Sequence, residues 1–231
     1  MNQPIDAPTH VLLDLDGTIS DSSPGIARSL QHAFGVCGYR PPSDEQVRAV
    51  IGPPFETSFP TLGVPVDDIE RVVLAYRDRY EDIGLFENTV YPGIAEMLDE
   101  LAAAGHTLSI ATAKPEPTAK RIIEHFGFTG HFALQAGATV EVGTGRRTKA
   151  EVITYALVEL GLGPSDLANV VMIGDRDHDV EGALHNGIDC IGVTWGFGSA
   201  PELETAGAAA LVNTPDEVAA AVTATYRSVR P

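Results

Sequence analysis

Four short apolar runs constrain the fold of this chain more than any other feature. They cover residues 10–14, 108–112, 170–175 and 188–193. Their length and composition are typical of buried strands. Helical patterns that stop at a glycine lie between these runs, at residues 94–104, 118–126 and 150–160. Because strand and helix alternate, we predict an α/β fold with a Rossmann-like core built on a parallel sheet.

The alternation is interrupted between residues 20 and 88, where helical patterns follow one another without a convincing strand. One of these patterns repeats apolar side chains at the spacing of a single buried helix face. Its members are Ile69, Val72, Val73, Tyr76 and Tyr80. We therefore predict an α-helical cap domain of residues 20–88, inserted into a core formed by residues 1–19 and 89–231.

Capping patterns predict where two of the helices begin. Ser43 with Gln46 and Thr214 with Glu217 both have the spacing of a capping box, in which each side chain binds a backbone N–H group of the first turn. A turn between two cap helices is expected at Gly52-Pro53-Pro54.

The charge balance bears on partners and location. Fifteen Lys and Arg face 32 Asp and Glu, and the net charge of −17 disfavours binding to nucleic acid or to an anionic membrane. Neither a leader peptide nor a run of about 20 apolar residues is evident. Cys37 and Cys190 lie outside any metal or CxxC motif, which favours a reduced, cytoplasmic protein. Whether it is a monomer or a homodimer stays open.

Three of the predicted strands end at polar side chains. Asp14, Thr112 and Asp175 each close an apolar run. In an open parallel sheet, ligands bind at the carboxyl ends of the strands, so we expect these three side chains to meet at one site.

The segment Asp14-Leu15-Asp16-Gly17-Thr18 places two carboxylates two residues apart at the end of a strand. Two acids this close repel each other unless a cation neutralises them, and oxygen ligands favour Mg²⁺. Gly17 allows the chain to turn sharply there. A solvated Asp-Gly turn is the simpler alternative.

A second acidic segment follows the third run. Asp175 and Asp179 are four residues apart and share one face if a helix begins immediately. An acidic helix N-cap would explain them without a metal, because acidic residues favour helix N-termini. His178 lacks a partner at metal-ligand spacing and is expected to be a surface or packing histidine.

Taken together, these motifs resemble the haloacid dehalogenase superfamily over nearly the whole chain, and most closely its phosphoglycolate-phosphatase-like members. The matching positions are Asp14 with Asp16, Thr112, Lys149, and Gly174-Asp175 with Asp179. The resemblance implies that Asp14 is a nucleophile and Asp16 a general acid and base. It also implies a magnesium site formed by the carboxylates of Asp14 and Asp175 and the backbone carbonyl of Asp16.

The chemistry of the remaining positions agrees with these roles. Lys149 would screen the repulsion between a carboxylate and a phosphate, although a solvated lysine at a helix start is an alternative. The Thr112 hydroxyl and the Ala113 N–H group could bind the phosphoryl oxygens. Asp179 would hold Lys149 or a metal-bound water without touching the metal itself. Lys114 is a rival phosphate partner.

These features predict a magnesium-dependent phosphatase that acts on a small phosphorylated metabolite through an aspartyl-phosphate. The cap would set the choice of substrate, with Arg48 and residues 52–55 as candidates. A phosphotransferase of the phosphomutase kind would share the same nucleophile. A non-catalytic module that only accepts a phosphoryl group would use Asp14 alone. A dehalogenase is disfavoured because Asp16 and Asp175 would have no use in it.

Overall fold

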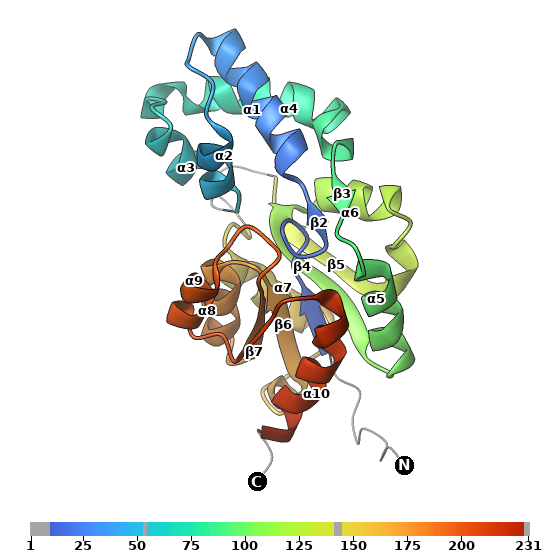
Figure 1. The fold of residues 1–231 in the computed structure, drawn as a ribbon. Coiled ribbons are helices and arrows are strands. Elements are labelled where there is room, and N and C mark those ends of the chain that lie inside the picture. The colour runs from blue at the N-terminus through green and yellow to red at the C-terminus, as the bar shows by residue number, and fades with distance from the viewer. Residues whose placement is uncertain (1–9, 53–54, 141–144, 229–231) are drawn as a thin grey trace. The chain divides into compact units, whose positions relative to one another are not determined.

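The computed structural model contains a six-stranded sheet, which lies among the helices in the lower part of Figure 1. The structure describes residues 10–52, 55–140 and 145–228. The strand order is β5-β4-β1-β6-β7-β8, and every pairing in this sheet is parallel. The strands are β1 (His10–Leu13), β4 (Thr107–Pro115), β5 (Phe132–Ala138), β6 (Val170–Gly174), β7 (Asp189–Val193) and β8 (Ala210–Val212). The predicted α/β fold with a parallel sheet is therefore confirmed.

Two strands of this sheet lie outside the predicted runs. The edge strand β5 has the sequence FALQAGA, and β8 is a three-residue segment in an Ala-rich stretch. Neither has the dense β-branched composition of β6, so neither stands out from the sequence. Pairing with a neighbouring strand, rather than local propensity, defines both.

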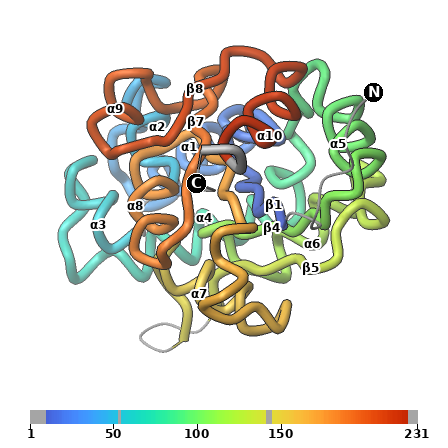
Figure 2. The backbone as a smooth tube through the Cα atoms, turned by 90° about the horizontal axis from the view of Figure 1, so that it is seen from below, coloured from blue at the N-terminus to red at the C-terminus, as the bar shows by residue number. Residues whose placement is uncertain are grey.

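Helices cover both faces of the sheet (Figure 2). On one side, α7 packs against α8, while α5 packs against α10 on the other. The helices of this part of the chain are α5 (Ile94–Ala103), α6 (Glu116–His125), α7 (Lys149–Glu159), α8 (Asp177–His185), α9 (Ala200–Ala206) and α10 (Val218–Ser228). Within the described ranges, none of the helices is long and apolar enough to cross a membrane.

The centre of the core is the strand β1, whose Val11, Leu12 and Leu13 are fully buried. Leu12 belongs to an apolar cluster that also contains Met172 of β6 and Val152 of α7. Complete burial of a side chain of this size stabilises a fold by about 1.5–3 kcal/mol. The burial of both faces of β1 explains why its sequence is continuously apolar rather than alternating.

The last helical segment begins after Thr214, as predicted, but the predicted capping box is absent. Thr214 makes no side-chain cap hydrogen bond, and a 3-10 turn (Pro215–Glu217) comes before α10. The Glu217 carboxylate accepts a hydrogen bond from the Asn213 N–H group instead, at 2.7 Å. The Glu217 carboxylate is therefore not bound to the Thr214 N–H group, as a capping box requires, and the α-helix proper begins at Val218.

The chain divides into two compact units: Met1–Ile19 with Tyr91–Pro231, which contains the parallel sheet, and Ser20–Val90. The second unit extends two residues past the predicted insertion because Thr89–Val90 (β3) pairs with Ser20–Asp21 (β2) as a short antiparallel ribbon. It also contains the helices α1 (Ser23–Cys37), α2 (Asp44–Val50), α3 (Phe55–Thr61) and α4 (Ile69–Asp82).

Aromatic side chains form much of the core of the second unit. The ring centroids of Phe55 and Phe59 are 4.7 Å apart, and Phe55 meets Tyr76 of α4 at 5.0 Å. The predicted face of α4 is buried at Ile69, Val72, Tyr76 and Tyr80, with Val73 half-buried.

The first capping prediction holds. Ser43 and Gln46 form the capping box that begins α2, with both of its hydrogen bonds present. The turn predicted at Gly52-Pro53-Pro54 cannot be compared, because Pro53 and Pro54 lie outside the described residues.

We predict that Gly137→Ala destabilises the protein by about 1–3 kcal/mol, the usual cost of overpacking. A Cβ atom at Gly137 in β5 would lie 2.6 Å from the Glu116 Cα and 2.7 Å from the Lys114 carbonyl oxygen, both of which are backbone atoms. Urea unfolding measures the change. The matched control is Gly130→Ala, whose Cβ would meet nothing within 4 Å. Equal stability of the two variants would contradict the close packing of β5 against the end of β4.

Candidate active site

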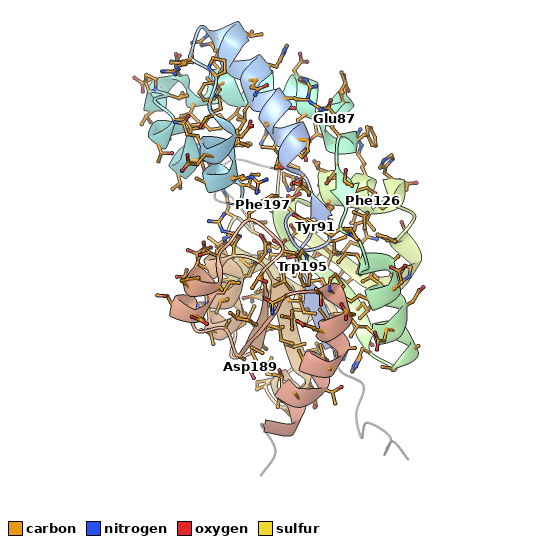
Figure 3. All side chains as sticks on the ribbon, viewed as in Figure 1. Glu87, Tyr91, Phe126, Asp189, Trp195 and Phe197 are labelled. Atoms are coloured by element: carbon orange, nitrogen blue, oxygen red, sulfur yellow. The ribbon has the colours of Figure 1, made fainter. Side chains whose placement is uncertain are left out.

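Strand register brings the three predicted strand ends to one edge of the sheet. Leu13, the last residue of β1, is level with Ile110 of β4 and with Ile173 of β6. Asp14 and Asp175 directly follow β1 and β6 at this edge. Thr112, two residues after Ile110, lies within β4, which continues past the predicted strand end to Pro115. Figure 3 labels Asp189, where β7 begins, and Trp195, just beyond its end, which locates this carboxyl edge.

Lys149 connects the two acidic segments. Its Nζ atom lies 2.7 Å from Asp14 Oδ1 and 2.7 Å from Asp179 Oδ1, and it donates a hydrogen bond to the Ala111 carbonyl oxygen at 3.0 Å. The lysine side chain is only 1% exposed. Burial by itself lowers the pKa of Lys149, but the carboxylates of Asp14 and Asp179 outweigh it and raise the pKa above its ordinary value. The two carboxylates therefore stabilise the charged form of the lysine.

The start of α7 fixes where Lys149 lies. Thr148 is the N-cap of the helix, and it forms a capping box with Glu151. The Thr148 hydroxyl accepts the Glu151 N–H group at 3.3 Å, and the Glu151 carboxylate accepts the Thr148 N–H group at 2.9 Å. Lys149 is consequently the first residue of a helix whose start is defined by two reciprocal hydrogen bonds.

The expectation that Asp175 and Asp179 share a helix face is wrong. The helix α8 begins at Asp177, two residues after Asp175, which belongs to the turn that follows β6. Asp179 instead folds back on this turn, and its Oδ2 atom accepts the N–H groups of Asp175 and Arg176, both at 3.1 Å. Although burial opposes it, Lys149 lowers the pKa of Asp179 below its ordinary value. Asp179 thus joins Lys149 to the backbone of Asp175.

Asp175 is completely buried and held by two donors. The Thr18 hydroxyl donates to its Oδ1 atom at 3.1 Å, and the Phe197 N–H group donates to its Oδ2 atom at 2.8 Å. Gly17, at φ +85°, passes so close that a Cβ atom there would lie 2.2 Å from Asp175 Oδ2. Burial, followed by the carboxylates of Asp179 and Asp14, raises the pKa of Asp175 well above its ordinary value.

The remaining predicted residues lie on the two segments beside Asp14. The Thr112 hydroxyl is buried and accepts the Lys114 N–H group at 3.3 Å, while Ala113 is half-buried. Asp16 pairs with the rival lysine, since Lys114 Nζ lies 2.8 Å from Asp16 Oδ2. The two lysines are therefore divided between the two acids of the first motif, Lys149 with Asp14 and Lys114 with Asp16.

Three nearby residues were missed or misjudged in the sequence. Thr18 binds Asp175, and Trp195 donates its indole N–H group to the Thr18 carbonyl oxygen at 3.0 Å. His178, expected to be a surface or packing residue, places a ring nitrogen within 4.8 Å of ligand atoms of Asp14 and Asp179. It lies there because it occupies the first turn of α8. In the sequence, the glycines at positions 196 and 198 alternate with aromatic residues. This pattern could have indicated that the segment around Trp195 lies close to the site.

The charges at this edge fit a divalent cation. Asp14, Asp175 and Asp179 are buried carboxylates, and among the described residues Lys149 is the buried ammonium group that faces them. When all three acids are ionised, the ammonium group of Lys149 balances one of the three negative charges. One divalent cation would balance the remaining two. Carboxylate oxygens are the ligands that Mg²⁺ prefers, and a ring nitrogen of His178 also lies near Asp14 and Asp179. The carboxylates of Asp14 and Asp175 are the side chains that would hold it.

Residues 11–193 match the family model described as haloacid dehalogenase-like hydrolase. The chain belongs to this family. The match spans all four motifs, from Asp14 to Asp179, so the resemblance expected from the sequence is confirmed.

The names of similar proteins describe different activities. A 5'-nucleotidase of Pseudomonas aeruginosa is 42% identical over 195 residues, which cover 84% of this chain and 86% of that protein. The tyrosine-protein kinase PtkA of Mycobacterium tuberculosis is 39% identical over 199 residues, or 86% of this chain. The matched residues span 66% of the length of that kinase. A crystal structure of a predicted phosphatase from Clostridium acetobutylicum superimposes with a TM-score of 0.87 at 36% identity, covering 94% of this chain and 99% of the other.

We predict that Mg²⁺ produces a saturable change in tryptophan fluorescence. Trp195 is the single tryptophan of the chain and is linked through Thr18 to Asp175, so the cation perturbs its surroundings. Fluorescence titration with MgCl₂ measures the effect. Asp175→Asn should weaken binding at least about tenfold, because it removes an anionic ligand. Asp189→Asn, at the opposite edge of the sheet, is the matched control and should titrate like the wild type. An unchanged titration of Asp175→Asn would exclude Asp175 as a ligand.

Proposed function

We propose that this protein is a magnesium-dependent phosphatase that hydrolyses small organic phosphate monoesters through an aspartyl-phosphate on Asp14. The observation that carries the proposal is the buried contact of 2.7 Å between Asp14 Oδ1 and Lys149 Nζ. A carboxylate with a fixed cation beside it can approach an anionic phosphate, because the cation offsets the repulsion between them. The phosphatase and nucleotidase relatives support the same reaction class.

In the first half of the reaction, an oxygen of the Asp14 carboxylate attacks phosphorus. The bond between phosphorus and the leaving oxygen breaks, and that oxygen takes a proton from the carboxyl group of Asp16. The products of this half-reaction are the free alcohol and an acyl phosphate on Asp14. In the second half, water attacks phosphorus and gives a proton to Asp16. The bond from Asp14 to phosphorus then breaks, which releases inorganic phosphate and restores both acids.

The other site residues bind the phosphoryl group and keep the acids in place. The Thr112 hydroxyl and the Ala113 N–H group donate hydrogen bonds to phosphoryl oxygens, and Lys149 stays beside Asp14 throughout. Asp179 orients Lys149 through the contact of 2.7 Å. A magnesium ion held by Asp14, Asp175 and the Asp16 backbone carbonyl would supply positive charge to the phosphoryl oxygens.

The proposal gives residues 20–88, within the unit Ser20–Val90, the role of a cap that selects the substrate. Its support is the sequence resemblance together with the compact helical core of that unit. The name of the nucleotidase relative makes nucleoside monophosphates the first substrates to assay, followed by phosphoglycolate and sugar phosphates.

Replacing residues 20–90 with the matching unit of the Pseudomonas nucleotidase should change the ranking of substrates. We expect the hydrolysis of p-nitrophenyl phosphate, a small generic ester, to persist within about tenfold, because Asp14, Asp16, Lys149 and Asp175 all lie outside the exchanged segment. Phosphate release from a panel of metabolites measures the profile. An unchanged ranking would contradict the assignment of selectivity to this unit.

We predict that Asp14→Asn abolishes phosphate release, lowering kcat by at least about 10⁴-fold, since the amide cannot form the acyl phosphate. Circular dichroism confirms folding of the variant. Asp99→Asn, an exposed aspartate paired with His131, is the matched control and should retain full activity. A chiral thiophosphate ester should react with retention at phosphorus, because two displacements occur. Inversion, or normal turnover by Asp14→Asn, would refute the aspartyl-phosphate.

A phosphotransferase is the second candidate, and the similarity to a tyrosine-protein kinase favours keeping it. Such an enzyme would pass the phosphoryl group to a hydroxyl other than that of water, as a phosphomutase does with sugars. Product analysis separates the reactions: free phosphate indicates hydrolysis, whereas phosphotyrosine or an isomeric sugar phosphate indicates transfer. A long-lived acyl phosphate without turnover would instead indicate a phospho-acceptor module.

A further inference from the structure

The proposed reaction gives a role to Lys149 but none to Lys114, the second lysine of the site. Lys114 lies at the end of β4, two residues after Thr112. Its Nζ atom is 2.8 Å from Asp16 Oδ2, and the two side chains are only 7% and 14% exposed. An ion pair shielded from water to this degree is screened far less than a surface pair. The positive charge of Lys114 therefore attracts the Asp16 carboxylate with little weakening by water.

The backbone around Lys114 is built to hold it in this place. The pairing of β4 with β5 shifts its register between Ala111 and Pro115, so the strand bulges where Lys114 lies. Gly137 of β5 permits this bulge, since a side chain there would collide with the Lys114 carbonyl oxygen. Just beyond, Glu116 is fixed by Arg146 at 2.7 Å. Lys114 thus projects from a backbone that is fixed on both sides.

The two oxygens of Asp16 have different surroundings. Oδ2 contacts Lys114, whereas Oδ1 is buried and finds no hydrogen-bond partner among the described residues. A buried acceptor without a partner is costly, and such atoms are common where a ligand completes the hydrogen bonding. A carboxylate fixed through one oxygen presents the other in a defined direction. This is the geometry required of a group that exchanges a proton with the substrate.

We propose that Lys114 is a positioning residue that anchors Asp16 through Oδ2, so that Oδ1 delivers a proton to the leaving oxygen and later receives one from water. This inference rests on the proposed function, and it assigns the proton exchange to one atom. Lys114 itself moves no proton. The alternative is that Lys114 binds the phosphoryl group directly. In that case its removal would slow the hydrolysis of all esters equally, whatever their leaving group.

Leaving-group dependence distinguishes the two roles. 2,4-Dinitrophenolate departs readily without protonation, whereas phenolate needs an acid. If Lys114 acts through Asp16, Lys114→Met should lower kcat/KM for phenyl phosphate by about 10²-fold or more, the range of general acid catalysis. For 2,4-dinitrophenyl phosphate it should lower kcat/KM by less than about fivefold. Asp16→Asn should show the same selectivity, and the double variant should be no slower than Asp16→Asn.

Two further variants complete the experiment. Lys114→Arg keeps the charge and should recover most of the loss on phenyl phosphate. Lys120→Met makes the same change on α6, at an exposed lysine that pairs with Glu116, and should leave both substrates unaffected. An equal loss on the two esters would place Lys114 at the phosphoryl group, and no loss on either would remove it from the reaction. Either result overturns the inference.

A measurement without substrate keeps the test independent of the proposed function. Urea unfolding of Lys114→Met, Asp16→Asn and the double variant gives the coupling between the two side chains. We expect the pair to change the unfolding equilibrium constant by about tenfold beyond additivity. Additive effects would refute the anchoring of Asp16 whether or not the wild type is a phosphatase. A wild type that is inactive on all esters, yet shows this coupling, would refute only the proposed function.

Discussion

The contact between one buried ammonium group and two buried carboxylates determines how the candidate site is built. Lys149 Nζ touches Asp14 Oδ1 and Asp179 Oδ1, each at 2.7 Å, in surroundings that exclude solvent almost completely. Removing one member of such a group typically costs about 3–5 kcal/mol, because an uncompensated charge stays behind. The three residues come from α7, from the end of β1 and from α8, so this one contact ties together three distant parts of the chain.

The surroundings of Asp175 add a second constraint, which is spatial rather than electrostatic. Gly17 and Gly196 both pass so close to this side chain that a Cβ atom at either position would lie within 2.5 Å of it. The carboxylate is therefore closely packed by the backbone, and Thr18 and Phe197 donate hydrogen bonds to its two oxygens. The glycines are as much a part of the site as the acids, although they carry no reactive group.

How much could be predicted from the sequence depends on whether a feature has a local cause. The strands β1, β6 and β7 and the capping box at Ser43 were predictable, because their signals lie within a few residues. The strand β5 was not, since its alanines and glycine serve the close approach to β4.

The same reason applies within the site. That acids follow β1 and β6 was predictable, whereas the partners of Lys114 and His178 depend on a bulge in β4 and on the residue at which α8 begins. The bulge has no signature in the neighbouring residues, and the start of α8 involves the Asp179 carboxylate, which accepts the Arg176 N–H group. The failed capping box at Thr214 shows the converse, a local pattern overridden by a competing donor, the Asn213 N–H group, which binds the Glu217 carboxylate.

The position of β1 in the sheet has a consequence for biosynthesis. His10 begins the strand, yet its partners are Thr107 on one side and Val170 on the other. On a ribosome that adds ~5–20 residues per second, the second partner emerges roughly 10–30 s after β1. The unit Ser20–Val90 is complete and can fold during that interval. The apolar segment that ends in Asp14 has no partner until β4 emerges, and one of its edges stays unpaired until β6 emerges. The nascent chain therefore exposes an apolar segment that could aggregate, and the shortness of β1, four residues, limits that hazard.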